Sequence, residues 1–170
     1  MGKAIGWKGT EMNAKAHAVR LVLCLAAVAV AAGVGGLGTR AGLQDWYAEL
    51  AKPSWTPPGW LFGPVWTVLY AAMAVAAWLV WRTAEPAVAA RALTVFAIQL
   101  VLNAIWPLVF FGLRMPGAAF VEIVGLWAAV LVTVIVFWRS VPAAALLMVP
   151  YLCWVTFAAA LNLAVWRMNA

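Results

Sequence analysis

Charged side chains are scarce in this chain. Only 9% of its 170 residues are Asp, Glu, Lys or Arg, whereas 68% are hydrophobic and the mean hydropathy is +1.00. A water-soluble domain needs far more polar groups to cover its surface. The composition therefore excludes a soluble domain and indicates a protein that lies in the lipid bilayer.

Cysteine and histidine are almost absent. Cys24 and Cys153 lie in separate apolar stretches without a CxxC spacing, so both are expected to act as small apolar residues. His17 is the single histidine, and one histidine supplies neither two axial haem ligands nor a histidine pair for catalysis. No metal site and no cofactor is predicted. The chain also lacks a nucleotide-binding glycine loop and a cluster of basic residues that would indicate nucleic acid.

The few charges divide the chain into five long apolar stretches. Each is long enough for the ~20 residues that cross a hydrocarbon core, and strands of a membrane barrel would alternate polar and apolar residues, which these do not. We therefore predict an all-α membrane protein, a bundle of five transmembrane helices. The expected helices are 17–38, 63–82, 91–113, 116–138 and 142–166. They form one membrane domain over 14–170, preceded by a polar extension over 1–13 for which Met12 is an alternative start.

The connection between the first and second helices is the only long one, at roughly residues 39–62. It contains the run Lys52-Pro53-Ser54-Trp55-Thr56-Pro57-Pro58-Gly59-Trp60. Proline fixes backbone angles and tryptophan supplies a flat apolar surface, so this long loop is expected to be structured. We interpret it as a stiff aromatic lid over a ligand cavity.

The distribution of basic residues predicts the orientation in the membrane. Of the 11 Lys and Arg residues, those on the N-terminal side are Lys3, Lys8, Lys15, Arg20, Arg82, Arg91 and Arg139, and those opposite are Arg40, Lys52, Arg114 and Arg167. The excess predicts a cytoplasmic N-terminus, although it shrinks if the chain starts at Met12. A bacterial cell envelope is the expected setting.

Polar and aromatic residues recur at helical spacing on three of the expected helices. One face carries Gln99, Asn103, Trp106 and Phe110, a second carries Trp154, Ala158 and Asn162, and a third carries Trp66, Tyr70, Met73 and Ala77. Amides and phenols avoid lipid, so these faces are expected to converge on a pocket for a flat, mostly apolar ligand. The alternative is that the amides only join helices, while Trp78, Trp81, Trp138 and Trp166 near helix ends form an interfacial belt.

Glu122 is the single acid well inside a span. It either marks an ion path or partner contact, or reaches the headgroups and pairs with Arg114. The sequence leaves both interpretations open.

Several ordered motifs resemble those of one known family. They are Trp46-Tyr47, Lys52 to Gly59, Val65-Trp66-Thr67-Val68-Leu69-Tyr70, Asn103-Ala104-Ile105-Trp106-Pro107, Pro150-Tyr151-Leu152-Cys153-Trp154 and Leu161 to Arg167. Together they resemble the translocator protein family, also called the tryptophan-rich sensory protein or peripheral benzodiazepine receptor family. The resemblance covers roughly Ala14 to Asn169. It implies a five-helix bundle, usually a homodimer, that binds porphyrins such as protoporphyrin IX, and in some members cholesterol or benzodiazepine-site ligands.

The resemblance also implies which residues line the pocket. Those positions are Tyr47, Pro57, Trp66, Asn103, Trp106, Trp154 and Ala158, to which the helical spacing adds Tyr70. Trp66 and Trp154 match two tryptophans implicated in light-dependent porphyrin breakdown in certain bacterial members. The chain departs from the family's proposed cholesterol motif, because Leu161 to Arg167 contains no Tyr, so cholesterol binding through that motif is not expected. Pro107 is expected to kink the third helix near the pocket or free a carbonyl there.

Three functional hypotheses follow. The first is a porphyrin-binding membrane protein that senses, transports or regulates tetrapyrrole intermediates. The second is a photo-oxidative enzyme that degrades porphyrin through Trp66 and Trp154. The third is a structural or partner-binding membrane protein whose aromatic residues only pack.

Overall fold

The structure is a computed structural model that describes residues 4–170, with side chains described from residue 14 onward. The described part is helical apart from its connections. Its elements are α1 (Ala4–Gly42), α2 (Trp46–Glu49), α3 (Gly59–Thr83), α4 (Pro86–Pro107), the π-helical turn η1 (Leu108–Gly112), α5 (Pro116–Ser140) and α6 (Pro142–Met168). Five of these helices are long and apolar enough to cross a membrane, with η1 continuing the α4 span.

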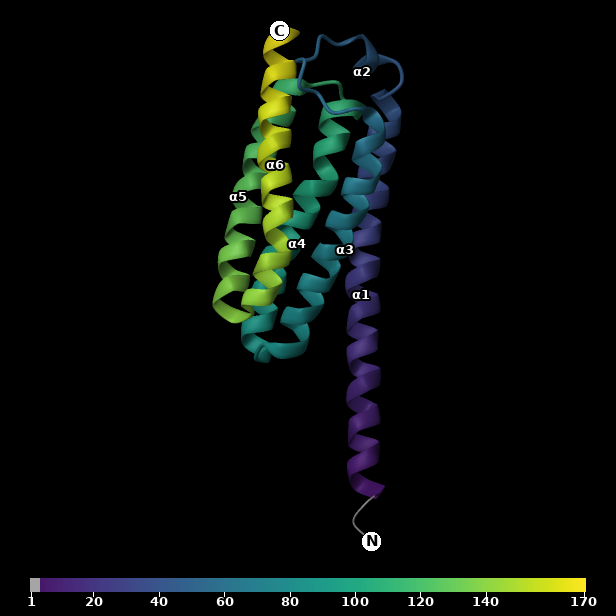
Figure 1. Cartoon of the computed structure of the whole chain (residues 1–170), viewed down its shortest axis with the longest axis vertical. Helices are drawn as coiled ribbons and strands as arrows, with labels where there is room; N and C mark the ends of the chain where they lie inside the picture. The colour runs from purple at the N-terminus through teal and green to yellow at the C-terminus, as the bar shows by residue number, and fades with distance from the viewer. Residues whose placement is uncertain (1–3) are drawn as a thin grey trace.

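The five long helices lie side by side as an up-and-down bundle (Figure 1). Short α2 and the C-terminus lie at one end, and the N-terminal part of α1 continues past the other end. Helix α1 packs against α3, α4 and η1, while α6 packs against α5 and α3. Large residues that are almost completely buried fill the space between the helices: Met73, Val80, Ile123, Val130, Phe137, Met148 and Tyr151.

Prolines begin three of the helices. Pro86, Pro116 and Pro142 occupy the first turns of α4, α5 and α6, where a missing N–H costs nothing because no carbonyl precedes it in the helix. The connections before them are short, so consecutive helices run antiparallel. The joint between η1 and α5 includes Arg114 in the left-handed region, with φ of 57°.

Pro107 changes the geometry of the third span as expected, but by a π-turn. A proline cannot donate to the preceding turn, and beyond it Leu113 N–H bonds to the Leu108 carbonyl at 2.8 Å, five residues back. The wider turn buries Phe110 and Phe111 in the bundle.

The prediction of an all-α, five-span bundle with a long structured loop is confirmed. The helices extend beyond the expected ranges, most clearly α1, which runs from Ala4 to Gly42. Apolar pattern alone misses such ends, because helices continue into polar residues outside the hydrocarbon core. Residues 1–3 lie outside the described part, and the division between a 1–13 extension and a 14–170 domain stays a prediction.

Candidate functional site

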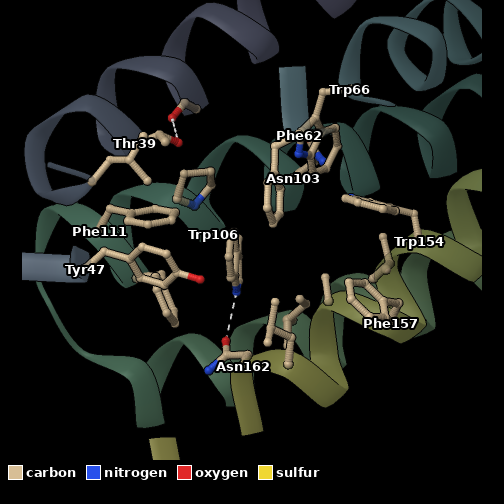
Figure 2. A pocket seen from close by; sticks show the side chains of 18 of the residues that line it. Thr39, Tyr47, Phe62, Trp66, Asn103, Trp106, Phe111, Trp154, Phe157 and Asn162 are labelled. Carbon is tan, nitrogen blue, oxygen red and sulfur yellow. Dashed lines mark hydrogen bonds between the residues drawn. The ribbon is translucent and has the colours of Figure 1, made fainter. Parts of the chain in front are cut away.

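A cavity of about 420 Å³ lies between the helices under the α1–α3 connection. We call that connection, residues 43–58, the lid. The cavity walls come from α1, the lid, α3, α4, η1, α5 and α6 (Figure 2). Its volume falls in the range of roughly 300–1,000 Å³ that is usual for small-molecule sites.

All the residues predicted to bind ligand lie on the wall of this one cavity. They are Tyr47, Pro57, Trp66, Tyr70, Asn103, Trp106, Trp154 and Ala158. They come from the lid, α3, α4 and α6, segments far apart in the sequence. The three helical faces therefore converge, and what they bind is taken up below.

Three residues of the same predicted faces lie elsewhere. Gln99, Met73 and Ala77 are buried in the core and are absent from the cavity wall. Gln99 and Met73 are about one turn farther from the lid than a residue that does line it, and Ala77 is about two turns farther, where one turn is ~5.4 Å along a helix. The cavity thus ends near Asn103 and Tyr70, and the deeper residues are packing residues.

A buried hydrogen-bond network closes the deep end of the cavity. The Tyr70 hydroxyl donates to Asn103 Oδ1 at 2.7 Å, and Asn103 Nδ2 donates to the Tyr151 hydroxyl oxygen at 2.9 Å. The Trp66 ring stacks on Tyr70 at 5.2 Å between centroids and meets Tyr151 edge-on at 6.2 Å. Asn103 therefore joins α3, α4 and α6, and both interpretations of it hold, as helix contact and as cavity wall.

A second polar pair lies across the cavity. Trp106 Nε1 donates to Asn162 Oδ1 at 3.1 Å, the dashed bond in Figure 2, and Asn162 Nδ2 donates to the Pro116 carbonyl at 2.8 Å. The indole and amide thus satisfy each other, and α4, α5 and α6 meet at this point. Buried polar groups in a membrane protein require such partners.

Aromatic rings form most of the remaining wall. Trp106 stacks on Phe110 at 5.0 Å between centroids, and Trp154 lies 5.5 Å from Phe157 and 5.8 Å from Phe62. Each aromatic pair of this kind stabilises the fold by about 0.5–1.5 kcal/mol beyond the effect of its buried area. The result is a hollow with flat, rigid sides.

Polar contacts of Lys52 stabilise the lid from within. Lys52 Nζ donates to the carbonyls of Tyr47, Ala48 and Leu50 at 2.7, 3.1 and 2.8 Å, and it lies 4.8 Å from the Tyr47 ring centroid. These bonds satisfy the carbonyl end of short α2. Although Lys52 lines the cavity, its donors are thus engaged by the lid itself.

Tyr47 carries a hydroxyl that points from the lid into the cavity (Figure 2). Its ring packs edge-on against Phe111 at 5.4 Å between centroids. Burial raises the pKa of the Tyr47 phenol, because desolvation disfavours the phenolate. The group therefore remains a neutral hydrogen-bond donor at physiological pH.

The C-terminus also holds the lid. Asn169 accepts from the Ala51 N–H at 3.0 Å and donates to the Ala51 carbonyl at 2.9 Å, while its amide also donates to the Val165 carbonyl at 2.7 Å. Sequence reasoning missed Asn169. A terminal amide carries no signal that identifies a partner so distant in the sequence.

Sequence reasoning also missed part of the wall, namely Phe62, Phe111, Phe157 and the α1 residues Gly35, Gly36 and Thr39. The available signal was the group of small residues on the first span, which leaves room beside a helix.

Glu122 lies on α5 outside the cavity wall. Both carboxylate oxygens are buried without a hydrogen-bond partner among the described residues, so the alternative in which Glu122 pairs with Arg114 is wrong. Among residues 14–170, Lys52 is the only charged side chain on the wall. The described wall therefore offers aromatic contact and burial but no acid–base pair.

Comparisons with known proteins agree with this architecture. The model of the TspO/MBR family matches residues 21–167. The tryptophan-rich protein TspO of Chlorobaculum tepidum is 41% identical over 153 residues, covering 88% of this chain and 95% of the relative. The human translocator protein is 44% identical over 128 residues, covering 73% and 75%, and protein CrtK of Rhodobacter capsulatus is 38% identical over 159 residues, covering 93% and 95%. With most of its length matched by the family model and by these relatives, the chain belongs to the TspO/MBR family.

Proposed function

We propose that the cavity binds a porphyrin or a related tetrapyrrole and that the protein senses, transports or regulates such intermediates. The single observation that carries the proposal is the convergence of Trp66, Trp106 and Trp154 on one enclosed hollow under the lid. A flat, largely apolar macrocycle gains most from such a site, because flat rings stack and hydrophobic area is removed from water. Family membership supports this assignment.

Binding is tested with protoporphyrin IX and purified protein in detergent, through quenching of tryptophan fluorescence. We expect saturable quenching, and we expect Ala158→Leu to weaken binding at least about ten-fold, because the added branch occupies cavity space and overpacking costs ~1–3 kcal/mol.

The matched control is Ala160→Leu. Ala160 follows Ala158 by two residues on α6 and lies on the outer, exposed face of the bundle. It adds the same atoms outside the cavity and should leave binding unchanged. If no quenching saturates, or if both variants bind like the parent, the proposal is wrong and the aromatic residues serve packing alone.

Light-driven porphyrin degradation is the second candidate function. It is favoured by the placement of Trp66 and Trp154 on the same wall, from α3 and α6. An excited porphyrin can oxidise an indole, and dioxygen is the terminal oxidant such a reaction requires. Illumination of the complex in air should then remove porphyrin absorbance faster than illumination of free porphyrin. A rate equal to that of free porphyrin, or one unchanged in Trp66→Phe and Trp154→Phe, contradicts this candidate.

We propose further that the protein is a homodimer with a cytoplasmic N-terminus in a bacterial envelope, and that benzodiazepine-site ligands share the cavity. The basic residues on the N-terminal side support the orientation. The enclosed apolar cavity supports the second ligand class.

A further inference from the structure

A second hollow lies at the end of the bundle opposite the lid. Its volume is about 340 Å³, and it is bounded by α1, the end of α3 and the first turns of α4. Its polar lining includes the side chains of Arg20 and Arg82. No step of the proposed tetrapyrrole function uses this hollow.

Arg20 reaches the hollow from α1, and two contacts with Trp81 hold its guanidinium in place. Its Nη1 donates to the Trp81 carbonyl at 2.9 Å, and its guanidinium carbon lies 5.8 Å from the Trp81 ring centroid. A guanidinium carries five N–H donors, so most of them remain for a ligand. The neighbouring Trp78 Nε1 donates to the His17 carbonyl at 3.0 Å, which fixes α1 against α3 at this level.

Arg82 approaches the same hollow from α3. Its guanidinium carbon stacks 4.9 Å from the Trp78 ring centroid, a contact that orients the group while leaving its N–H edge available. Within residues 14–170, neither Arg20 nor Arg82 pairs with a carboxylate. Glu85 lies near in the sequence but is exposed and does not line the hollow.

The start of α4 adds positive potential. Pro86 and Ala89 of its first turns line the hollow, but Pro86 has no N–H and the Ala89 N–H already donates to the Glu85 carbonyl at 2.8 Å, so the helix contributes its dipole rather than free donors. Helix starts favour anions for this reason. Two arginines and the start of a helix therefore point to an anion with oxygen acceptors.

The remaining lining is apolar and continues toward the lipid. Ala90 and Leu93 of α4 border the hollow, and the outer face of the same helix carries Ile98 and Val101, which are 53% and 59% exposed. An occupant with an anionic head and an apolar body fits both parts. Basic hollows between membrane helices hold lipid headgroups in this way.

We propose that this hollow binds the phosphate headgroup of an anionic phospholipid, with Arg20 and Arg82 contacting the phosphate and α4 contacting an acyl chain. The site lies in the leaflet on the side of the chain's N-terminus, opposite the lid. It is separate from the cavity under the lid, and its test uses no porphyrin.

The test is native mass spectrometry of the purified full chain, equilibrated with equal amounts of phosphatidylglycerol and phosphatidylcholine. We expect preferential retention of phosphatidylglycerol. The preference should fall about five-fold in Arg82→Gln and in Arg20→Gln, because a basic residue near anionic lipid contributes about that factor. Among the described residues the Arg82 side chain stacks on the Trp78 ring and makes no side-chain hydrogen bond, so its variant should fold, which thermal unfolding in phosphatidylcholine alone will verify.

Arg91→Gln and Arg139→Gln are the matched controls. Both remove one positive charge at the same end of the bundle but outside the hollow, and both should keep the preference. Three results would each overturn the proposal: equal retention of the two lipids, equal loss in the control variants, or displacement of phosphatidylglycerol by inorganic phosphate. The last result would assign the arginines to a soluble ion.

Discussion

At the scale of single residues, Asn103 links two tyrosines at the deep end of the cavity. It accepts from the Tyr70 hydroxyl and donates to the Tyr151 hydroxyl, although it is only 3% exposed. Its removal would leave two phenols without their partner in a region that water does not reach. Its bonds therefore support the deep end of the cavity.

We expect Asn103→Leu to lower the free energy of unfolding by about 1–2 kcal/mol, measured by denaturation in detergent. The matched control is Thr94→Val on the same helix, where the lost hydroxyl bonds only to the Ala90 carbonyl on an exposed face. An equal effect of the two changes would show that the network contributes no stability of its own.

Sequence reasoning was effective for residues that repeat along a helix. Trp66 and Tyr70, or Trp154 and Ala158, lie one turn apart, so their common face could be predicted and the structure places them on one wall. It failed for Gln99, because periodicity gives the face of a helix but not the depth at which a cavity ends. Gln99 is completely buried, with no hydrogen-bond partner for its amide among the described residues.

At the scale of elements, the contact between α1 and η1 shapes one side of the cavity. A Cβ atom added to Gly38 would lie 2.8 Å from the Leu108 nitrogen, and one added to Gly42 would overlap the Phe111 carbonyl. The backbones of the first and third spans therefore meet without an intervening side chain. Phe110 and Phe111 reach the cavity from this contact.

We expect Gly42→Ala to destabilise the protein by about 1–3 kcal/mol and to weaken ligand binding, because backbone atoms must move to admit the methyl group. Gly33→Ala is the control on the same helix, since its added Cβ would meet no atom within 4 Å. Thermal unfolding and ligand titration of both variants measure the difference. A Gly42→Ala protein as stable as the Gly33→Ala protein would contradict the close approach.

The sequence predicted the existence of each span better than its form. Long uncharged stretches identify spans because lipid admits few charges, whereas the π-turn after Pro107 depends on how α1 packs beside it. Gly38 and Gly42 allow that packing, and they lie more than 60 residues earlier in the sequence. The residue pattern within one segment does not reveal a packing partner that lies so far away in the sequence.

At the scale of the whole molecule, the C-terminal end of the membrane domain meets the lid. Asn169 follows α6 and hydrogen-bonds to both the N–H and the carbonyl of Ala51, so the C-terminus holds the lid in place. Figure 1 shows this proximity, with the C-terminus beside the lid and α2. Ligand exchange through the lid requires these bonds to break.

We expect Asn169→Ala to speed hydrogen exchange at the Ala51 amide by about five-fold, because the native state loses a bond contributing ~1 kcal/mol. Release of a bound ligand should become faster as well, in stopped-flow measurements. Met168→Ala, an exposed neighbour on the same turn, is the control. Unchanged exchange in Asn169→Ala would mean that other contacts, such as the packing of Tyr47 against Phe111, hold the lid alone.

The mutual pairing of polar groups in the cavity wall has a consequence for selectivity. The Tyr70–Asn103 and Trp106–Asn162 bonds already satisfy these groups, so a guest molecule meets few donors or acceptors on the wall beyond the Tyr47 hydroxyl. Its affinity then depends mainly on its thickness and outline, and a methyl group that fits badly lowers the binding free energy by only ~1–3 kcal/mol. A receptor of this kind accepts chemically unrelated flat compounds, provided that their contours match the slot.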